Sequence, residues 1–158
     1  MANATVFSGR QRELLVAVLN RVIPGEINLP GAGDLGVASA IERNVLDSPR
    51  LRRIFAEGLA AIDLAAWQSN DRDFVDLESE QQDTVLKVVE RDRPEFFDVL
   101  ITHTYRAYYV NPRILLALGI EARPPQPNGY HLPAFDETLL DNVRRRGRLF
   151  RQTDPRPT

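Results

Sequence analysis

The chain contains no cysteine among its 158 residues. Without thiols it can form no disulfide, no thiolate nucleophile, no iron–sulfur cluster and no Cys-ligated zinc site. A C-x-x-C-H sequence is therefore also absent, so any haem of a larger complex is bound elsewhere. The two histidines, His103 and His131, lack the short spacing that is typical of zinc ligands. We expect the chain itself to bind no metal and no cofactor.

An excess of charge of one sign is also missing. The 20 basic and 22 acidic side chains leave a formal net charge of -2, so no overall field attracts nucleic acid or an anionic membrane. Lys87 is the only lysine, and the planar guanidinium of arginine suits contacts between proteins. Neither feature favours nucleic acid as a partner.

Long hydrophobic runs are absent as well. No apolar stretch approaches the ~20 residues that a membrane-spanning helix requires, so we expect no direct insertion into a membrane. The N-terminal sequence MANATVFSGRQ has no basic segment followed by an apolar run, so it does not resemble an export signal. As written, the sequence predicts a cytoplasmic protein. A periplasmic location would require an export leader that has been removed.

Helical periodicity is present along most of the chain. In residues 9–23 apolar pairs recur every four residues, Ser8 and Gln11 have the spacing of a capping box, and Pro24 ends the pattern. The same periodicity predicts further helices, which begin at Asp34, at Ser48-Pro49, at Ser79 with Gln82, at Pro94 and at Asn111-Pro112, the last ending at Gly119. No segment alternates strictly enough to predict a sheet. The sequence therefore predicts an all-α, single-domain bundle of about six to seven helices.

Gly58 is an unusual member of the apolar stripe in the helix predicted after Ser48. The other positions of that stripe carry apolar side chains, among them Phe55 and Ile62. A glycine among them indicates a point where another helix crosses closely.

The composition changes after residue 119. The segment EARPPQPNGYHLPAF contains four prolines, which lack the amide hydrogen that helices and inner strands need, so we expect an extended arm. Asp136 is placed to cap a short final helix, and the polar end QTDPRPT is expected to be disordered. The predicted domains are a helical bundle over residues 1–119 and, over residues 120–158, a Pro-rich arm, a short helix and a polar tail.

His103 is the strongest candidate for a general base in a stand-alone enzyme. Its helical neighbours three and four positions away include no carboxylate that would orient the imidazole ring. We therefore predict no catalytic residue, and an enzyme that uses His103 is kept as an alternative hypothesis.

Two other motifs point to the binding of anions. The glycines in GAGDLG fit the G-x-G-x-x-G pattern of dinucleotide-binding loops, but prolines occupy the place of the buried strand that the motif requires. The Arg144–Arg148 cluster would suit nucleic acid, yet cations also complement the C-terminal end of a helix, and nearby carboxylates dilute the charge. Nucleic-acid binding through Arg144–Arg148 is a second alternative hypothesis.

The segment THTYRAYYVNPR, residues 102–113, concentrates tyrosine and arginine near the end of a predicted helix. At 3.6 residues per turn, Tyr108 joins the apolar face, whereas Tyr105 and Tyr109 project away from it. Amphipathic aromatic side chains outside a core are typical of docking surfaces. The candidate partner contacts in this region and in the arm are Tyr105, Tyr109, Arg113, Tyr130 and His131.

Three motifs in the helical part occur together: IP followed by a Pro-Gly-Ala loop, F-x-x-L-x-x-x-Q-Q before a helix, and Y-Y-x-x-P. In this order they resemble the gluconate 2-dehydrogenase subunit 3 family. The similarity runs from about Leu14 to Pro112.

The resemblance implies a small, non-catalytic subunit of a dehydrogenase. In that family the large subunit belongs to the FAD-dependent glucose-methanol-choline oxidoreductase group, holds the flavin and the catalytic histidine, and oxidises sugars, sugar acids or polyols. The small subunit supports maturation or stability of the large one and often carries a twin-arginine export signal. The resemblance thus places FAD in the partner subunit and no cofactor in this chain, and it allows a cytochrome as a further partner.

Overall fold

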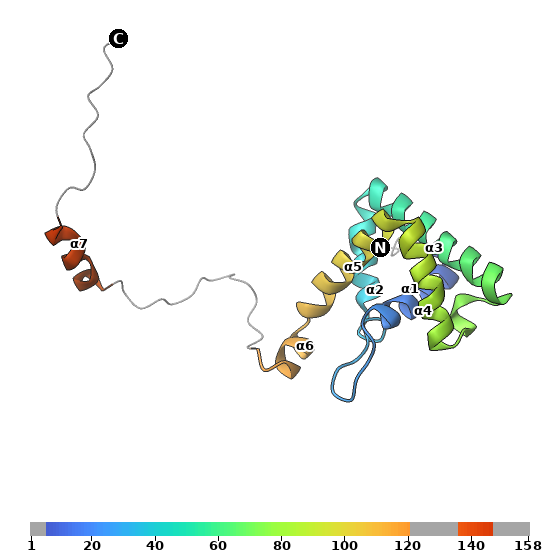
Figure 1. Cartoon of the computed structure of the whole chain (residues 1–158), viewed down its shortest axis with the longest axis horizontal. Coiled ribbons are helices and arrows are strands. Elements are labelled where there is room, and N and C mark those ends of the chain that lie inside the picture. Colours follow the sequence, from blue (N-terminus) through green and yellow to red (C-terminus); the bar gives the residue numbers. More distant parts are fainter. Residues whose placement is uncertain (1–5, 121–135, 147–158) are drawn as a thin grey trace, which may run out of the picture. The chain divides into compact units, whose positions relative to one another are not determined.

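A computed structural model describes residues 6–120 and 136–146, and both stretches consist of helices and loops (Figure 1). The helical elements are α1 (Gly9–Val22), α2 (Val37–Leu46), α3 (Pro49–Asn70), η1 (Phe74–Asp76), α4 (Ser79–Asp92), α5 (Pro94–Tyr109), α6 (Pro112–Ala117), η2 (Glu137–Leu140) and α7 (Asp141–Arg145). In these two stretches the β pairing is limited to an isolated bridge between Glu26 and Leu29. The predicted all-α fold is confirmed.

The chain divides into two compact units, Met1–Ala122 and Arg123–Thr158. In the second unit the helical segment begins where the sequence predicts, because Asp136 Oδ1 accepts a hydrogen bond from the Thr138 N–H at 3.0 Å. That segment is a 3₁₀ turn followed by the short α7, and not one continuous helix. Among the described helices of both units, none is long and apolar enough to cross a membrane.

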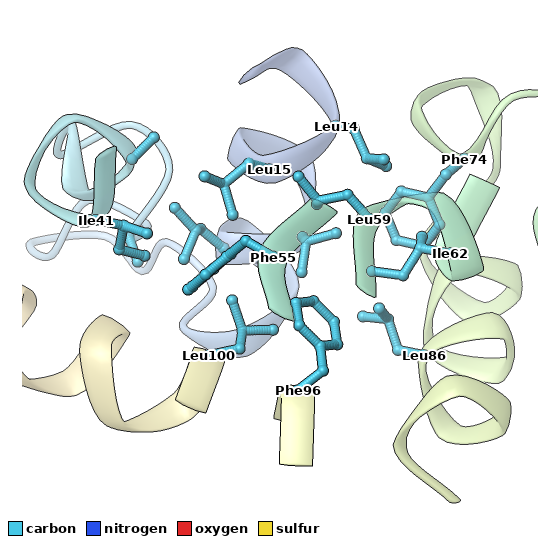
Figure 2. Close-up of a cluster of buried hydrophobic side chains, with 14 of the residues drawn as sticks. Leu14, Leu15, Ile41, Phe55, Leu59, Ile62, Phe74, Leu86, Phe96 and Leu100 are labelled. Atoms are coloured by element: carbon cyan, nitrogen blue, oxygen red, sulfur yellow. The ribbon is translucent and has the colours of Figure 1, made fainter. Parts of the chain in front are cut away.

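The core of the bundle is centred on Phe55 of α3 (Figure 2). Phe55 is 0% exposed, and the centroid of its ring lies 6.1 Å from that of Phe7 and 5.8 Å from that of Phe96. The other core residues labelled in Figure 2 are Leu14, Leu15, Ile41, Leu59, Ile62, Phe74, Leu86 and Leu100. They come from different helices and from η1, so the apolar stripes of the sequence converge on one shared core.

Gly58 allows α3 and α5 to cross closely, as predicted. A Cβ atom at this position would overlap the ring of Phe96. Gly58 is buried in the middle of α3, and Phe96 is buried in the first turn of α5. The missing side chain therefore makes room for an aromatic ring from the neighbouring helix.

The predicted caps of α1, α3 and α6 are confirmed. The Ser8 N–H donates to Gln11 Oε1 at 2.9 Å, and the Gln11 N–H donates to Ser8 Oγ at 3.3 Å, which completes the capping box. The side chains of Ser48 and Asn111 accept backbone hydrogen bonds at the starts of α3 and α6. Gly119, with a φ of 71°, follows α6 in the left-handed conformation that commonly ends a helix.

The prediction that Asp34 caps α2 is wrong. Helix α2 begins after Gly36, which has a φ of 80° and offers no side chain for capping. Asp34 Oδ1 instead accepts a hydrogen bond from Asn20 Nδ2 of α1 at 3.0 Å. A tertiary contact with α1 has replaced the local cap.

The predicted capping box of α4 is displaced by one residue. The Glu78 N–H donates to Gln81 Oε1 at 3.2 Å, so the box begins at Glu78 and Ser79 is already helical. Gln82 is buried, and its side chain donates to the Phe74 carbonyl at 2.9 Å. Gln82 therefore fastens η1 to α4 and has no capping role.

Candidate partner interface

Helix α5 presents different kinds of surface on its two faces. Its buried residues are Phe96, Leu100, Thr104 and Tyr108. Tyr105 and Tyr109 lie on the outer face and are 46% and 48% exposed, so their predicted outward orientation is confirmed. Their rings pack edge to face, with centroids 5.8 Å apart and an interplanar angle of 76°. The outer face therefore carries a pair of half-exposed aromatic rings, and the Tyr109 ring also packs on the buried Tyr108, with centroids 5.2 Å apart.

Helix α6 follows α5 at one end of the bundle (Figure 1). Further large apolar side chains between residues 110 and 120 are exposed. Helix α6 is held on the bundle by the buried Ile114. We define the α5–α6 surface as the two outer tyrosines and the exposed apolar residues that follow them in the chain: Tyr105, Tyr109, Val110, Leu116, Leu118 and Ile120. Large apolar side chains gathered at the surface of a folded domain are typical of a protein interface.

Tyr108 connects the end of α5 to the loop between α1 and α2. Its ring is buried, and its hydroxyl donates to the Pro30 carbonyl at 2.9 Å. Burial, followed by the neighbouring Tyr109 and Glu26, raises the pKa of Tyr108, so the hydroxyl keeps its proton and continues to donate at neutral pH. The loop of residues 24–31 is thereby held beside the α5–α6 surface.

Arg113 is the other predicted contact that lies in a described stretch. It is exposed near the start of α6 and forms no ion pair with any residue of 6–120 or 136–146. Its guanidinium is thus available to a partner. Tyr130 and His131, the remaining predicted contacts, lie outside the described residues.

His103 lies at the edge of the buried face of α5, as predicted. Its Nδ1 is 3.2 Å from Nδ2 of Asn44 in α2, and its ring packs edge-on against Phe55. Because an amide nitrogen donates, Nδ1 accepts, and the proton of the neutral ring is on Nε2. Across the two described stretches no carboxylate forms a hydrogen bond with His103, so the partner that would orient a general base is not found there.

The loop with the G-x-G-x-x-G pattern packs against α1. The Gly33 N–H donates to Asn20 Oδ1 at 2.8 Å, and a Cβ atom on Gly33 would overlap the carbonyl oxygen of Val16. A Cβ atom on Gly31 would collide with the Asn20 side chain. Close packing on α1 therefore explains these glycines without a bound phosphate.

The C-terminal arginine cluster is described only in part, because Arg148 lies outside residues 136–146. Arg144 lies 3.7 Å from the carboxylate of Asp141, and Arg145 donates to Asn142 Oδ1 at 2.8 Å. These two arginines are thus engaged by neighbours on α7 itself. Over the described residues there is also no group of three His, Cys, Asp or Glu side chains placed to bind a metal ion.

The family model described as Gluconate 2-dehydrogenase subunit 3 matches residues 9–116, from the start of α1 into α6. The chain belongs to the gluconate 2-dehydrogenase subunit 3 family. The resemblance predicted from Leu14 to Pro112 is confirmed, and the match to subunit 3 also includes Arg113. Searches of curated proteins and of solved structures gave no match. The family name identifies its members as a subunit of a dehydrogenase complex.

Two well-defined features of this subunit 3 protein are not singled out by its sequence. Glu42 of α2 is 8% exposed, accepts a hydrogen bond from the Val6 N–H at 3.1 Å, and pairs with Arg12 at 2.7 Å. It fastens the segment before α1 to α2. Ile27, in the loop after α1, is 101% exposed. An apolar residue in the middle of a turn is the one sequence signal that could have identified it.

We expect His103 to lower the stability of the subunit below about pH 6.5. Burial, and then the charge of Arg106, lower the pKa of His103 from its ordinary value of 6.5. The unfolded chain therefore binds a proton before the folded chain does. Stability falls as the pH drops from 6.5 toward the folded-state pKa, and above 6.5 His103 has no effect.

Urea unfolding above and below this pH, with His103→Gln as the comparison, tests the assignment. The variant should lose less stability on acidification than the wild type, because it has no imidazole to protonate. Identical losses in the two proteins would show that His103 does not cause the pH dependence.

Proposed function

We propose that this chain is a non-catalytic accessory subunit that binds and stabilises the catalytic subunit of a sugar, sugar-acid or polyol dehydrogenase. The observation that carries the proposal is the family match over residues 9–116, which covers the helices that build the core. The proposed partner is a large FAD-dependent subunit of the glucose-methanol-choline oxidoreductase group. That subunit holds the FAD, and this chain holds no cofactor.

The α5–α6 surface supports the proposal by offering a place for the large subunit to dock. Tyrosine and arginine are over-represented among the side chains that contribute most to binding at protein interfaces. Tyr105, Tyr109 and Arg113 offer both kinds of side chain on the bundle, and we propose Tyr130 and His131 as further contacts. A complex of this kind can also include a cytochrome subunit, whose haem is bound outside this chain.

Stabilisation in this proposal follows from mass action. A subunit that binds only the folded, flavin-loaded partner raises the partner's free energy of unfolding by about 2.7 kcal/mol when its free concentration is about 100 times its Kd. No new catalytic group is needed for this effect. The accessory role therefore requires an interface and not an active site.

Co-expression tests whether the two proteins bind. An affinity tag is placed only on the proposed partner, a large glucose-methanol-choline-type subunit from the same genome. We expect this chain to be retained with the tagged subunit and to co-elute with its flavin absorbance on size-exclusion chromatography. Retention of the large subunit alone, with this chain in separate fractions, would contradict the proposed function.

A further inference from the structure

The loop after α1 is a small hairpin that displays one apolar side chain. The Glu26 N–H donates to the Leu29 carbonyl at 2.7 Å, and the Leu29 N–H donates back to the Glu26 carbonyl at 3.2 Å. Ile27 and Asn28 form the turn between them, and Ile27 is 101% exposed. The apolar side chain thus stands entirely outside the bundle.

The hairpin is held in place at its base. The Ala32 N–H donates to the Ile23 carbonyl at 3.0 Å, and Tyr108 of α5 donates to the Pro30 carbonyl at 2.9 Å. These bonds come from both ends of the loop and from a separate helix. The position of Ile27 relative to α5 is therefore fixed before any partner binds, which reduces the entropy that binding would cost.

The fold itself gives no reason for isoleucine at this position. Turn centres favour polar residues, glycine or proline, and a β-branched side chain gains nothing there from packing when it is fully exposed. Asn28, next in the chain, is a residue that turns do favour. Ile27 is thus an exposed apolar group on a rigid support, which is the form of an interface anchor.

The hairpin is fastened to α5 through Tyr108, whose ring contacts that of the outer Tyr109. On a helix with 3.6 residues per turn, the side chains follow one another around α5 in the order Tyr108, Tyr105, Tyr109 and Arg106. The two outer tyrosines therefore lie between Tyr108, which holds the hairpin, and Arg106. Arg106 and Arg113 are exposed and form no ion pair with any residue in the two described stretches. Arg106 and Arg113 therefore offer positive charge that the described residues do not pair, while Glu26 of the hairpin and Asp98 of α5 are exposed carboxylates in the same region.

We infer that Ile27 seats in an apolar pocket of the dehydrogenase's large subunit, and that carboxylates beside that pocket pair with Arg106 and Arg113. This inference rests on the proposed function and specifies the surface that carries it out. The apolar anchor supplies affinity, and the arginines select a partner surface of opposite charge. The occupant is thus a folded protein with a pocket for a branched aliphatic side chain and an acidic rim.

Binding of purified variants to the purified large subunit tests the anchor. Ile27→Asn places a turn-favouring polar residue at the tip, and the exposed Leu64→Gln on α3 removes an apolar side chain elsewhere. We expect Ile27→Asn to raise the Kd by about thirtyfold, as loss of a hot-spot residue does, and Leu64→Gln to leave it unchanged. Both variants should keep the thermal unfolding midpoint of the wild type to within a few degrees.

The charged part is tested with the double variant Arg106→Glu and Arg113→Glu. It should bind more weakly than the wild type at low salt, and the difference should shrink as salt is added.

If the wild type binds and Ile27→Asn binds equally well, the proposal that Ile27 is an anchor is wrong, while the proposed function stands. If the double variant shows no loss at low salt, the acidic rim is wrong. A wild type that does not bind overturns the proposed function and the inference together.

Discussion

Replacing Phe55 with alanine is expected to lower the free energy of unfolding by about 3 to 5 kcal/mol. The Phe55 side chain is fully buried at the point where the core residues of the bundle meet (Figure 2). Its ring packs against Phe7 at 6.1 Å and Phe96 at 5.8 Å, so its removal leaves a cavity between α3, α5 and the segment before α1. Urea unfolding followed by far-UV circular dichroism measures the change.

Tyr105→Ala is the matched control for this substitution. Tyr105 is also aromatic and helical, but it lies on the outer face of α5 and is 46% exposed. Its loss should lower the free energy of unfolding by no more than about 1 kcal/mol, because the edge-to-face contact with Tyr109 is the main interaction that is removed. Equal effects of the two substitutions would contradict the assignment of Phe55 to the core and of Tyr105 to the surface.

Replacing Gly58 with leucine is expected to destabilise the bundle by about 3 kcal/mol. The added side chain would occupy the space of the Phe96 ring, so α3 and α5 would have to separate. Gly58→Ala should be destabilising too, although alanine favours a helix over glycine by roughly 0.5 to 1 kcal/mol. Gly58→Ala therefore lowers the free energy of unfolding if steric overlap dominates, and raises it if helix propensity dominates.

Two further variants complete this experiment. Gly9→Ala in the first turn of α1 adds a Cβ that meets no atom within 4 Å, so it should not destabilise the protein. Phe96→Leu should partly relieve the overlap, so the double variant with Gly58→Ala should be more stable than the sum of the single effects predicts. Additive effects of the two substitutions would argue against direct contact between these positions.

Features that depend on a single helix could be predicted from the sequence. The outward position of Tyr105 and Tyr109 follows from 3.6 residues per turn, and the structure confirms it. Gly58 could be recognised as a close crossing because it is a glycine on the apolar stripe of its helix. The sequence does not show that Phe96 is the residue that crosses there, because that pairing depends on how α3 and α5 meet.

Local spacing predicts the wrong capping residue where a tertiary contact competes with the local one. Asp34 has the right spacing to cap α2, but Asn20 of α1 donates to its carboxylate and α2 begins later, after Gly36. Gln82 has the right spacing for a capping box, but it is drawn into the interior by its bond to the Phe74 carbonyl. Neither contact is visible in a local pattern.

The local sequence gives no sign of the role proposed for Ile27, for a related reason. Its segment is rich in proline and glycine, so it is identified as a loop, and loops carry exposed residues of every kind. The role proposed for Ile27 rests on the hydrogen bond between Tyr108 and the Pro30 carbonyl, which joins residues far apart in the chain. Only the folded arrangement shows that this loop is fixed beside Tyr105 and Tyr109.

The most direct test of the accessory role is the flavin content of the large subunit made with and without this chain. The large subunit is purified from both expressions, and the ratio of bound FAD to polypeptide is measured from the visible and ultraviolet absorbance. The proposed function predicts a higher ratio and a higher thermal unfolding midpoint when this chain is present. Equal flavin content and equal midpoints in the two preparations would contradict it.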